Sequence, residues 1–142
     1  FISDRVGRRK PVIIAGALVL LASLAWILYG PVGVLPPYVL GLIAGIASGA
    51  AMLPYTVIKE ANPPNVSGTS TGVINFINFT FSALLGPVFA GLLSRTSGAQ
   101  RDLAAYQVSF QPLMYGVGLA VIFAFLLRET GPAARRPAPT GA

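Results

Sequence analysis

The chain has 142 residues, of which 54% are apolar and only 10% are charged, and its mean hydropathy is +0.72. Soluble domains carry about a quarter charged residues, and disordered chains combine low hydrophobicity with high net charge, so this composition argues against both classes. Cysteine and histidine are absent. Disulfides, thiolate nucleophiles and imidazole chemistry are therefore excluded, and we expect neither a metal nor a cofactor.

Three long intervals of the sequence, 11–58, 61–94 and 103–127, contain no charged residue. Each interval is long enough to cross a hydrocarbon core of about 30 Å, and glycines and prolines at 30–37 divide the first interval into two helices. We therefore predict an all-α integral membrane protein. Residues 1–129 would form its membrane part, with a loop at 1–11 and four transmembrane helices at about 12–29, 37–58, 71–94 and 107–127.

The distribution of basic residues predicts the orientation of these helices. Eight of the ten Lys and Arg residues belong to the termini and the 59–70 connector, and only Arg95 and Arg101 belong to the opposite side. The positive-inside rule places the larger group, and so both ends of the chain, in the cytoplasm. The tail at 130–142 is predicted to be disordered. Because the basic residues flank apolar segments, the net charge of +6 indicates a lipid bilayer and not a nucleic-acid partner.

Small and polar residues form one stripe along the second predicted helix. At helical spacing the stripe contains Gly41, Gly45, Ser48, Met52 and Tyr55, with Gly49 beside it. Small residues let another helix approach closely, so the glycines predict helix packing. The three larger residues either take part in the same packing or border a solute path.

The third predicted helix carries a more polar stripe, formed by Thr71, Asn75, Asn78 and Ser82, with Gly86 close to the same line. An amide without a hydrogen-bond partner in hydrocarbon costs several kcal/mol, so this stripe must face protein, water or a ligand. Two interpretations remain open. Asn75, Asn78 and Ser82 either bond to neighbouring helices or line a solute path, while Gly86 is assigned to helix packing.

The loop before the first helix has an unusual order of charges. Asp4 can cap a helix, arginines can pair with carboxylates, and Gly7 permits a tight turn. A cytoplasmic membrane anchor would explain why the loop is basic, but not the order in which Asp4 and the arginines occur. The run of Asp4, Arg5, Gly7, Arg8 and Arg9 resembles the signature loop of the major facilitator superfamily, Gly-x-x-x-Asp-Arg-x-Gly-Arg-Arg/Lys, without its leading glycine.

The resemblance implies a part of a twelve-helix fold. Four helices followed by a tail fit helices nine to twelve of the family, and helices three to six are the alternative placement. The chain is then expected to be a truncated piece whose partners are the missing N-terminal helices. By the same resemblance, the tenth helix would line a cavity, the eleventh would lie at an interface, and Asp4 and Arg5 would latch the cytoplasmic side.

The function that this resemblance implies is secondary transport of a small solute by alternating access, in a plasma membrane and most simply a bacterial inner membrane. The alternative is a stand-alone four-helix membrane scaffold or assembly subunit. No acid or base lies inside a predicted helix. A general acid–base pair is therefore lacking, and we do not expect an enzyme.

Overall fold

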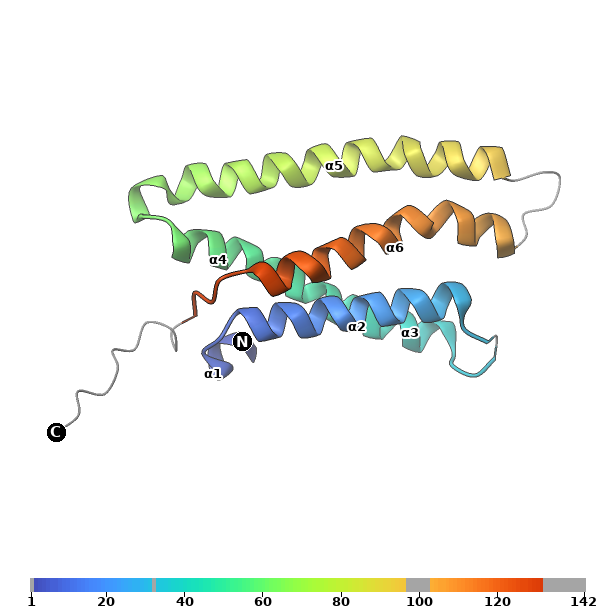
Figure 1. Ribbon diagram of the computed structural model, residues 1–142, viewed down its shortest axis with the longest axis horizontal. Helices are drawn as coiled ribbons and strands as arrows, with labels where there is room; N and C mark the ends of the chain where they lie inside the picture. The colour runs from blue at the N-terminus through green and yellow to red at the C-terminus, as the bar shows by residue number, and fades with distance from the viewer. Residues whose placement is uncertain (1, 32, 97–102, 132–142) are drawn as a thin grey trace.

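The computed structural model describes residues 2–31, 33–96 and 103–131. Figure 1 shows long helices running side by side, with the N-terminus and the ends of α4 and α6 at the same end of the bundle. The α-helices are α1 (Ile2–Val6), α2 (Lys10–Tyr29), α3 (Pro37–Ser48), α4 (Leu53–Ala61), α5 (Ser67–Thr96) and α6 (Leu103–Leu126), and the 3₁₀ helices are η1 (Gly49–Met52) and η2 (Pro64–Val66).

Four helical segments are long and apolar enough to cross a membrane. They are Lys10–Tyr29, Pro37–Ala61, Pro64–Arg95 and Leu103–Leu126. The described residues form helices and connecting turns only, without strands. The predicted fold class, an all-α membrane protein with four transmembrane helices, is confirmed.

α2 has two main neighbours, α3 and α6, while α5 packs against α6 and α4. A small apolar cluster of Ile13, Val57 and Ala124 joins α2, α4 and α6. At the opposite end of the bundle, the Gln107 side chain donates to the Leu28 carbonyl at 2.6 Å and links α6 to the end of α2. α5 exposes large side chains such as Phe76, Phe79 and Leu84, as expected for a surface that meets lipid or further helices.

The second span is not a continuous α-helix, because η1 separates α3 from α4. Pro54 has no N–H group and so cannot donate to the carbonyl of Ala50 four residues before it. The structure satisfies that carbonyl in another way, since Ala50 accepts from the N–H group of Leu53 in the tighter 3₁₀ pattern. The sequence predicts one helix over 37–58, and the proline explains why its middle winds differently.

Gly16, which lies outside the predicted stripes, permits close helix packing. A Cβ atom added to Gly16 of α2 would overlap the Cβ atom of Ala50 and lie 3.2 Å from the Ala47 carbonyl oxygen. The space around four other glycines is open to 4 Å in the described structure: Gly41, Gly45, Gly49 and Gly86. Their predicted role in helix packing stays a prediction about contacts with helices outside this chain.

We expect the Gly16→Ala substitution to lower the thermal stability of the full-length protein in detergent. The added methyl group meets another Cβ atom, which cannot rotate away, and overpacking of this kind costs about 1–3 kcal/mol. The melting temperature measures the effect. Gly118→Ala in α6 is the matched control, because its new methyl group meets nothing within 4 Å. Equal melting temperatures for the two variants would contradict the proposed contact.

Candidate functional site

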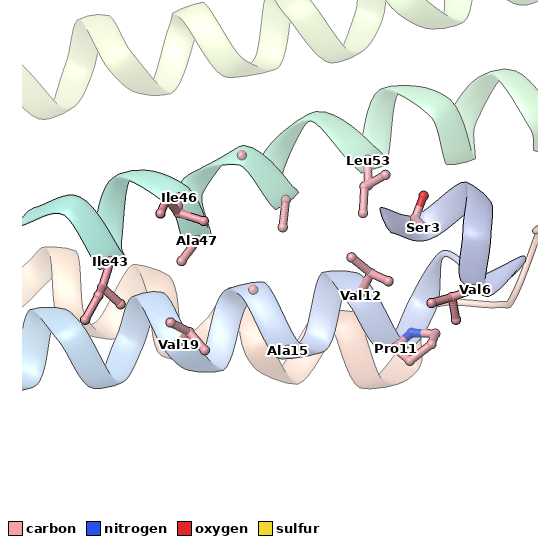
Figure 2. Close-up of a pocket in the computed structure, with 13 residues that line it drawn as sticks. Ser3, Val6, Pro11, Val12, Ala15, Val19, Ile43, Ile46, Ala47 and Leu53 are labelled. Carbon is pink, nitrogen blue, oxygen red and sulfur yellow. The ribbon is translucent and has the colours of Figure 1, made fainter. Parts of the chain in front are cut away.

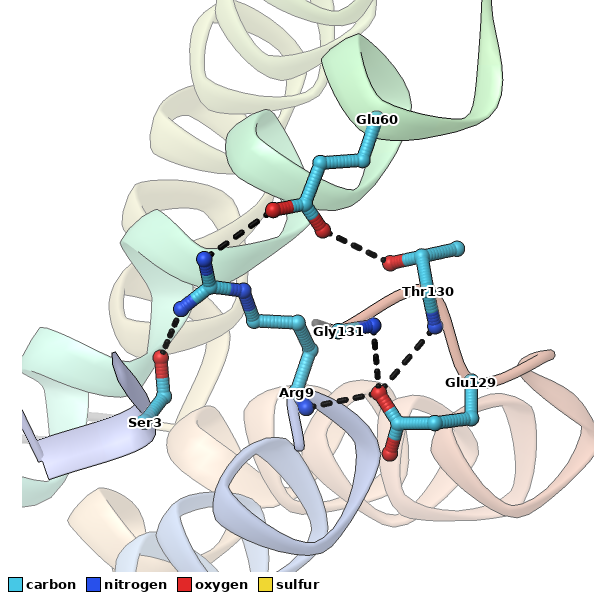
Figure 3. A network of polar contacts seen from close by, with 6 residues as sticks. All are labelled: Ser3, Arg9, Glu60, Glu129, Thr130 and Gly131. Atoms are coloured by element: carbon cyan, nitrogen blue, oxygen red, sulfur yellow. Dashed lines mark hydrogen bonds and ion pairs between the residues drawn. The ribbon is translucent and has the colours of Figure 1, made fainter. Parts of the chain in front are cut away.

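A set of charged and polar groups joins the ends of α1, α2, α4 and α6. We call it the terminal network, and Figure 3 shows the side chains and backbone atoms that form it. Its members are Ser3, Arg9, Glu60, Glu129, Thr130 and Gly131. They come from three separate parts of the sequence, so the network forms only when the helices have assembled.

Arg9 is the centre of the network. Its Nη2 atom lies 3.0 Å from Oε1 of Glu60, and the two side chains are only 9% and 19% exposed. Its Nη1 atom donates to the buried Ser3 hydroxyl at 2.5 Å. The other carboxylate oxygen of Glu60 accepts from the Thr130 hydroxyl at 3.0 Å. A shielded ion pair with these additional hydrogen bonds holds the end of α4 against the start of α2.

Glu129 caps α2 from the far end of the sequence. The residue preceding α2, Arg9, makes no side-chain cap of its own. Instead, the Glu129 carboxylate accepts from the N–H groups of Arg9 and Lys10 at 2.7 and 3.2 Å, as well as from Thr130 and Gly131 at 3.1 and 2.9 Å. The N–H groups of Arg9 and Lys10, at the start of α2, have no partner within the helix, and the helix dipole favours a negative charge beside them.

Two opposing effects act on the pKa of Glu129. Partial burial disfavours the charged carboxylate and raises the pKa, whereas the four backbone N–H donors favour the charged form and lower it. The donors prevail, and the pKa lies below its usual value. The carboxylate is therefore ionised at neutral pH and available as a cap.

The structure brings only part of the predicted signature loop into this network. Arg9 is central, and Gly7 adopts a positive φ of 67° in a tight turn, where its carbonyl oxygen lies 2.5 Å from the position of a Cβ atom on Gly131. Arg5 and Arg8 are exposed. Asp4 belongs to α1, and its side chain lies outside the described part of the structure. The latch by Asp4 and Arg5 stays a prediction.

Sequence reasoning missed Glu60 and Glu129, which are half of the four acids in the chain. A usable signal was present, because each acid directly follows a base at the end of an apolar interval, Lys59 or Arg128. The sequence places Thr130 and Gly131 in the predicted tail, but in the structure both belong to the terminal network. The rest of the predicted tail, 132–142, lies outside the described residues.

A second polar contact lies within the membrane-spanning part. The Tyr55 hydroxyl of α4 donates to Oδ1 of Asn75 in α5 at 2.8 Å, so the structure joins one residue from each predicted stripe. The other predicted path residues are not brought together. Ser48 bonds to the Gly45 carbonyl of its own helix at 2.7 Å, and Met52, Asn78 and Ser82 are exposed.

The bundle also contains an apolar groove of about 750 Å³ between α2 and the second span, with α1 at one end (Figure 2). Aliphatic side chains such as Val12, Val19, Ile43 and Leu53 line it, and Ser3 supplies the one polar side chain of the lining. A site for a hydrophilic solute needs several convergent polar groups. The groove is therefore a poor candidate, and within the described residues no cluster of acids offers a metal site either.

Acidification should remove the stabilisation that Glu129 provides. Because its folded pKa is lowered, the contribution is complete above the unfolded value of about 4.3 and is lost as the pH falls through the lower folded value. At pH 7 we expect Glu129→Gln to cost about 1 kcal/mol, which is typical of a lost helix cap. Melting temperatures of both proteins from pH 7 to pH 3 test this, and a gap that stays constant over that range would refute it.

Comparisons with known proteins agree with the membrane fold and with the family that the sequence resembles. The family description of the Major Facilitator Superfamily matches residues 1–142, the whole chain. No curated protein and no solved structure matches the sequence. Four helices able to cross a membrane and a match over the full length lead to one assignment: the chain belongs to the major facilitator superfamily, a family of membrane transporters and not of enzymes.

Proposed function

We propose that this chain forms helices nine to twelve of a secondary transporter that moves a small solute by alternating access. The observation that carries the proposal is the terminal network, in which one arginine and two carboxylates join three long helices at one end of the bundle. We place this end in the cytoplasm of a plasma membrane, most simply a bacterial inner membrane. The remaining N-terminal helices are the protein partners.

A reversible closure suits charged groups at a membrane surface. When the network separates, water can hydrate Arg9, Glu60 and Glu129, so that much of the lost interaction energy is recovered. If the same ion pair separated deep in hydrocarbon, no water would hydrate the separated charges. The joined and separated states can therefore differ by only a few kcal/mol, as two states that exchange during a transport cycle must.

The arrangement of the second span supports movement at this end. α3 packs mainly against α2, whereas α4 packs mainly against α5, and η1 connects the two halves. A 3₁₀ segment in the middle of a helix often marks a hinge. α4 can then separate from α2 together with α5, once Glu60 leaves Arg9 and Val57 leaves its apolar cluster.

The rest of the transporter must supply the other walls of the path, because four helices cannot enclose it. α5 is the best candidate for contact with that part, since none of its described residues is buried and its large apolar side chains are exposed along most of its length. The described spans carry charged residues only at their ends, at Lys10, Lys59, Glu60 and Arg95. An ion-coupling carboxylate, which transporters keep inside the membrane, would therefore belong to the other helices.

We expect Arg9→Gln in the full-length transporter to favour the state open to the cytoplasm. Hydrogen bonds to charged groups contribute about 1.5–3 kcal/mol, so the balance of states should shift about tenfold or more. A single cysteine introduced as Ser82→Cys in a cysteine-free background reports the change, because this deep position reacts faster with a membrane-impermeant maleimide applied from the cytoplasm when that side is open.

Arg128→Gln is the matched control. It removes the same charge from the same end of the bundle, but Arg128 is exposed and lies outside the terminal network. We expect its labelling rate to equal that of the wild type. Equal rates for Arg9→Gln and the wild type, or an equal increase for both variants, would show that the network does not close the path.

A further inference from the structure

Tyr55 and Asn75 form a hydrogen bond whose direction decides what the pair can bind. The Tyr55 hydroxyl is the donor and Oδ1 of Asn75 is the acceptor, at 2.8 Å, and both side chains are partly buried. The oxygen side of the carboxamide is thereby turned towards α4. The Nδ2 atom with its two N–H groups is directed away from the tyrosine.

These two N–H groups have no hydrogen-bond partner among the described residues. Several short hydroxyl side chains within the spans avoid this problem by donating to a carbonyl of their own helix, as Ser23, Ser48 and Ser109 do. The Asn75 amide does not. In hydrocarbon, donors of this kind must find an acceptor, because leaving them unpaired costs several kcal/mol.

The depth of the pair within the helices places it where a solute would pass. Asn75 follows the first residue of α5 by eight positions, which corresponds to about 12 Å along the helix axis. Asn78 and Ser82 continue the same line towards the middle of the span, and both are exposed. The pair thus lies between the terminal network and the deeper polar positions.

We infer that Tyr55 and Asn75 form a solute-binding pair, in which the Tyr55 hydroxyl orients the Asn75 carboxamide so that its N–H groups bind an oxygen atom of the solute. This inference rests on the proposed transport function and adds the chemical class of the solute. The solute must carry an acceptor oxygen, as a carboxylate, a sugar or a polyol does. The alkylammonium form of a simple amine has only donors, and a quaternary ammonium ion has no hydrogen-bonding group, so the N–H groups of the pair bind neither.

The pair is suited to binding that must be reversible. Both partners are neutral, so neither has to be stripped of the strongly bound water that surrounds a charge. Tyr55 fixes the carboxamide before the solute arrives, which reduces the entropy lost on binding. Whether the transporter is open to the cytoplasm or to the opposite side, a solute oxygen can then replace water at Asn75 without a large change in free energy.

The test is uptake by the full-length transporter in proteoliposomes, measured with radiolabelled solutes of three kinds: mono- and dicarboxylates, hexoses and polyols, and primary and quaternary amines. Asn75→Asp keeps the size of the side chain but replaces both N–H groups by an acceptor. We expect it to raise the KM for the transported solute about tenfold, and further if that solute is a carboxylate, with a smaller effect on kcat.

Tyr55→Phe is the milder variant, because it removes only the hydroxyl that orients Asn75. We expect a KM increase of about two- to tenfold. Thr80→Val is the matched control, since Thr80 is an exposed polar residue of the same helix that lies between Asn78 and Ser82 in depth but on another face. Its KM should match the wild type. Melting temperatures and membrane abundance of all variants show whether each protein is folded.

Several results would overturn the pair as a solute contact while leaving transport intact. One is an unchanged KM in both Asn75→Asp and Tyr55→Phe, and another is uptake by the wild type of amines alone. A lower melting temperature with an unchanged KM would show that Asn75 bonds to a neighbouring helix instead. If the folded wild-type protein takes up none of the solutes, the proposed function fails and the inference fails with it.

Discussion

Hydrocarbon offers a polypeptide no hydrogen-bond partners, and this constraint decides where each polar group of the chain is placed. Several hydroxyl groups within the spans turn back to carbonyls of their own helices, as Ser23, Ser94 and Ser109 do at 2.7–2.9 Å. The longer side chains of Tyr55 and Gln107 instead reach a neighbouring helix. Full charges are confined to the ends of the bundle, where water remains available, so the ionic contacts between helices are found there.

The two carboxylates of the terminal network have different electrostatic surroundings. Glu129 lies at the N-terminus of α2, where the helix dipole favours its charge. Glu60 belongs to the last turn of α4, where the dipole opposes a negative charge. Arg9 compensates for that unfavourable position. The same arginine offers its backbone N–H to one carboxylate and its guanidinium to the other, so a single residue couples the ends of α4 and α6.

The sequence predicts those features that depend on local pattern. The intervals without charge locate the four spans, and the amide of Asn75 requires a partner. Pairing across 120 residues, as between Arg9 and Glu129, depends on how the helices assemble and leaves no periodic signal. The same reason explains why Gly16 and not Gly45 makes the close contact, since both occur in apolar helices able to cross a membrane.

The two polar contacts of α4 differ in what can replace them. At the surface, Glu60 can exchange Arg9 for water, and α4 contributes one buried residue, Val57, to the apolar cluster with Ile13 and Ala124, so that exposing this side chain costs about 1.5–3 kcal/mol. Inside the membrane, Tyr55 can exchange Asn75 only for another polar group that enters the path. If this end opens as proposed, α4 therefore separates from α2 and stays with α5, because water replaces the ion pair at the surface while the Tyr55–Asn75 bond keeps α4 against α5. η1 precedes both contacts, so Tyr55 and Glu60 belong to one continuous segment, α4, on the same side of the 3₁₀ turn.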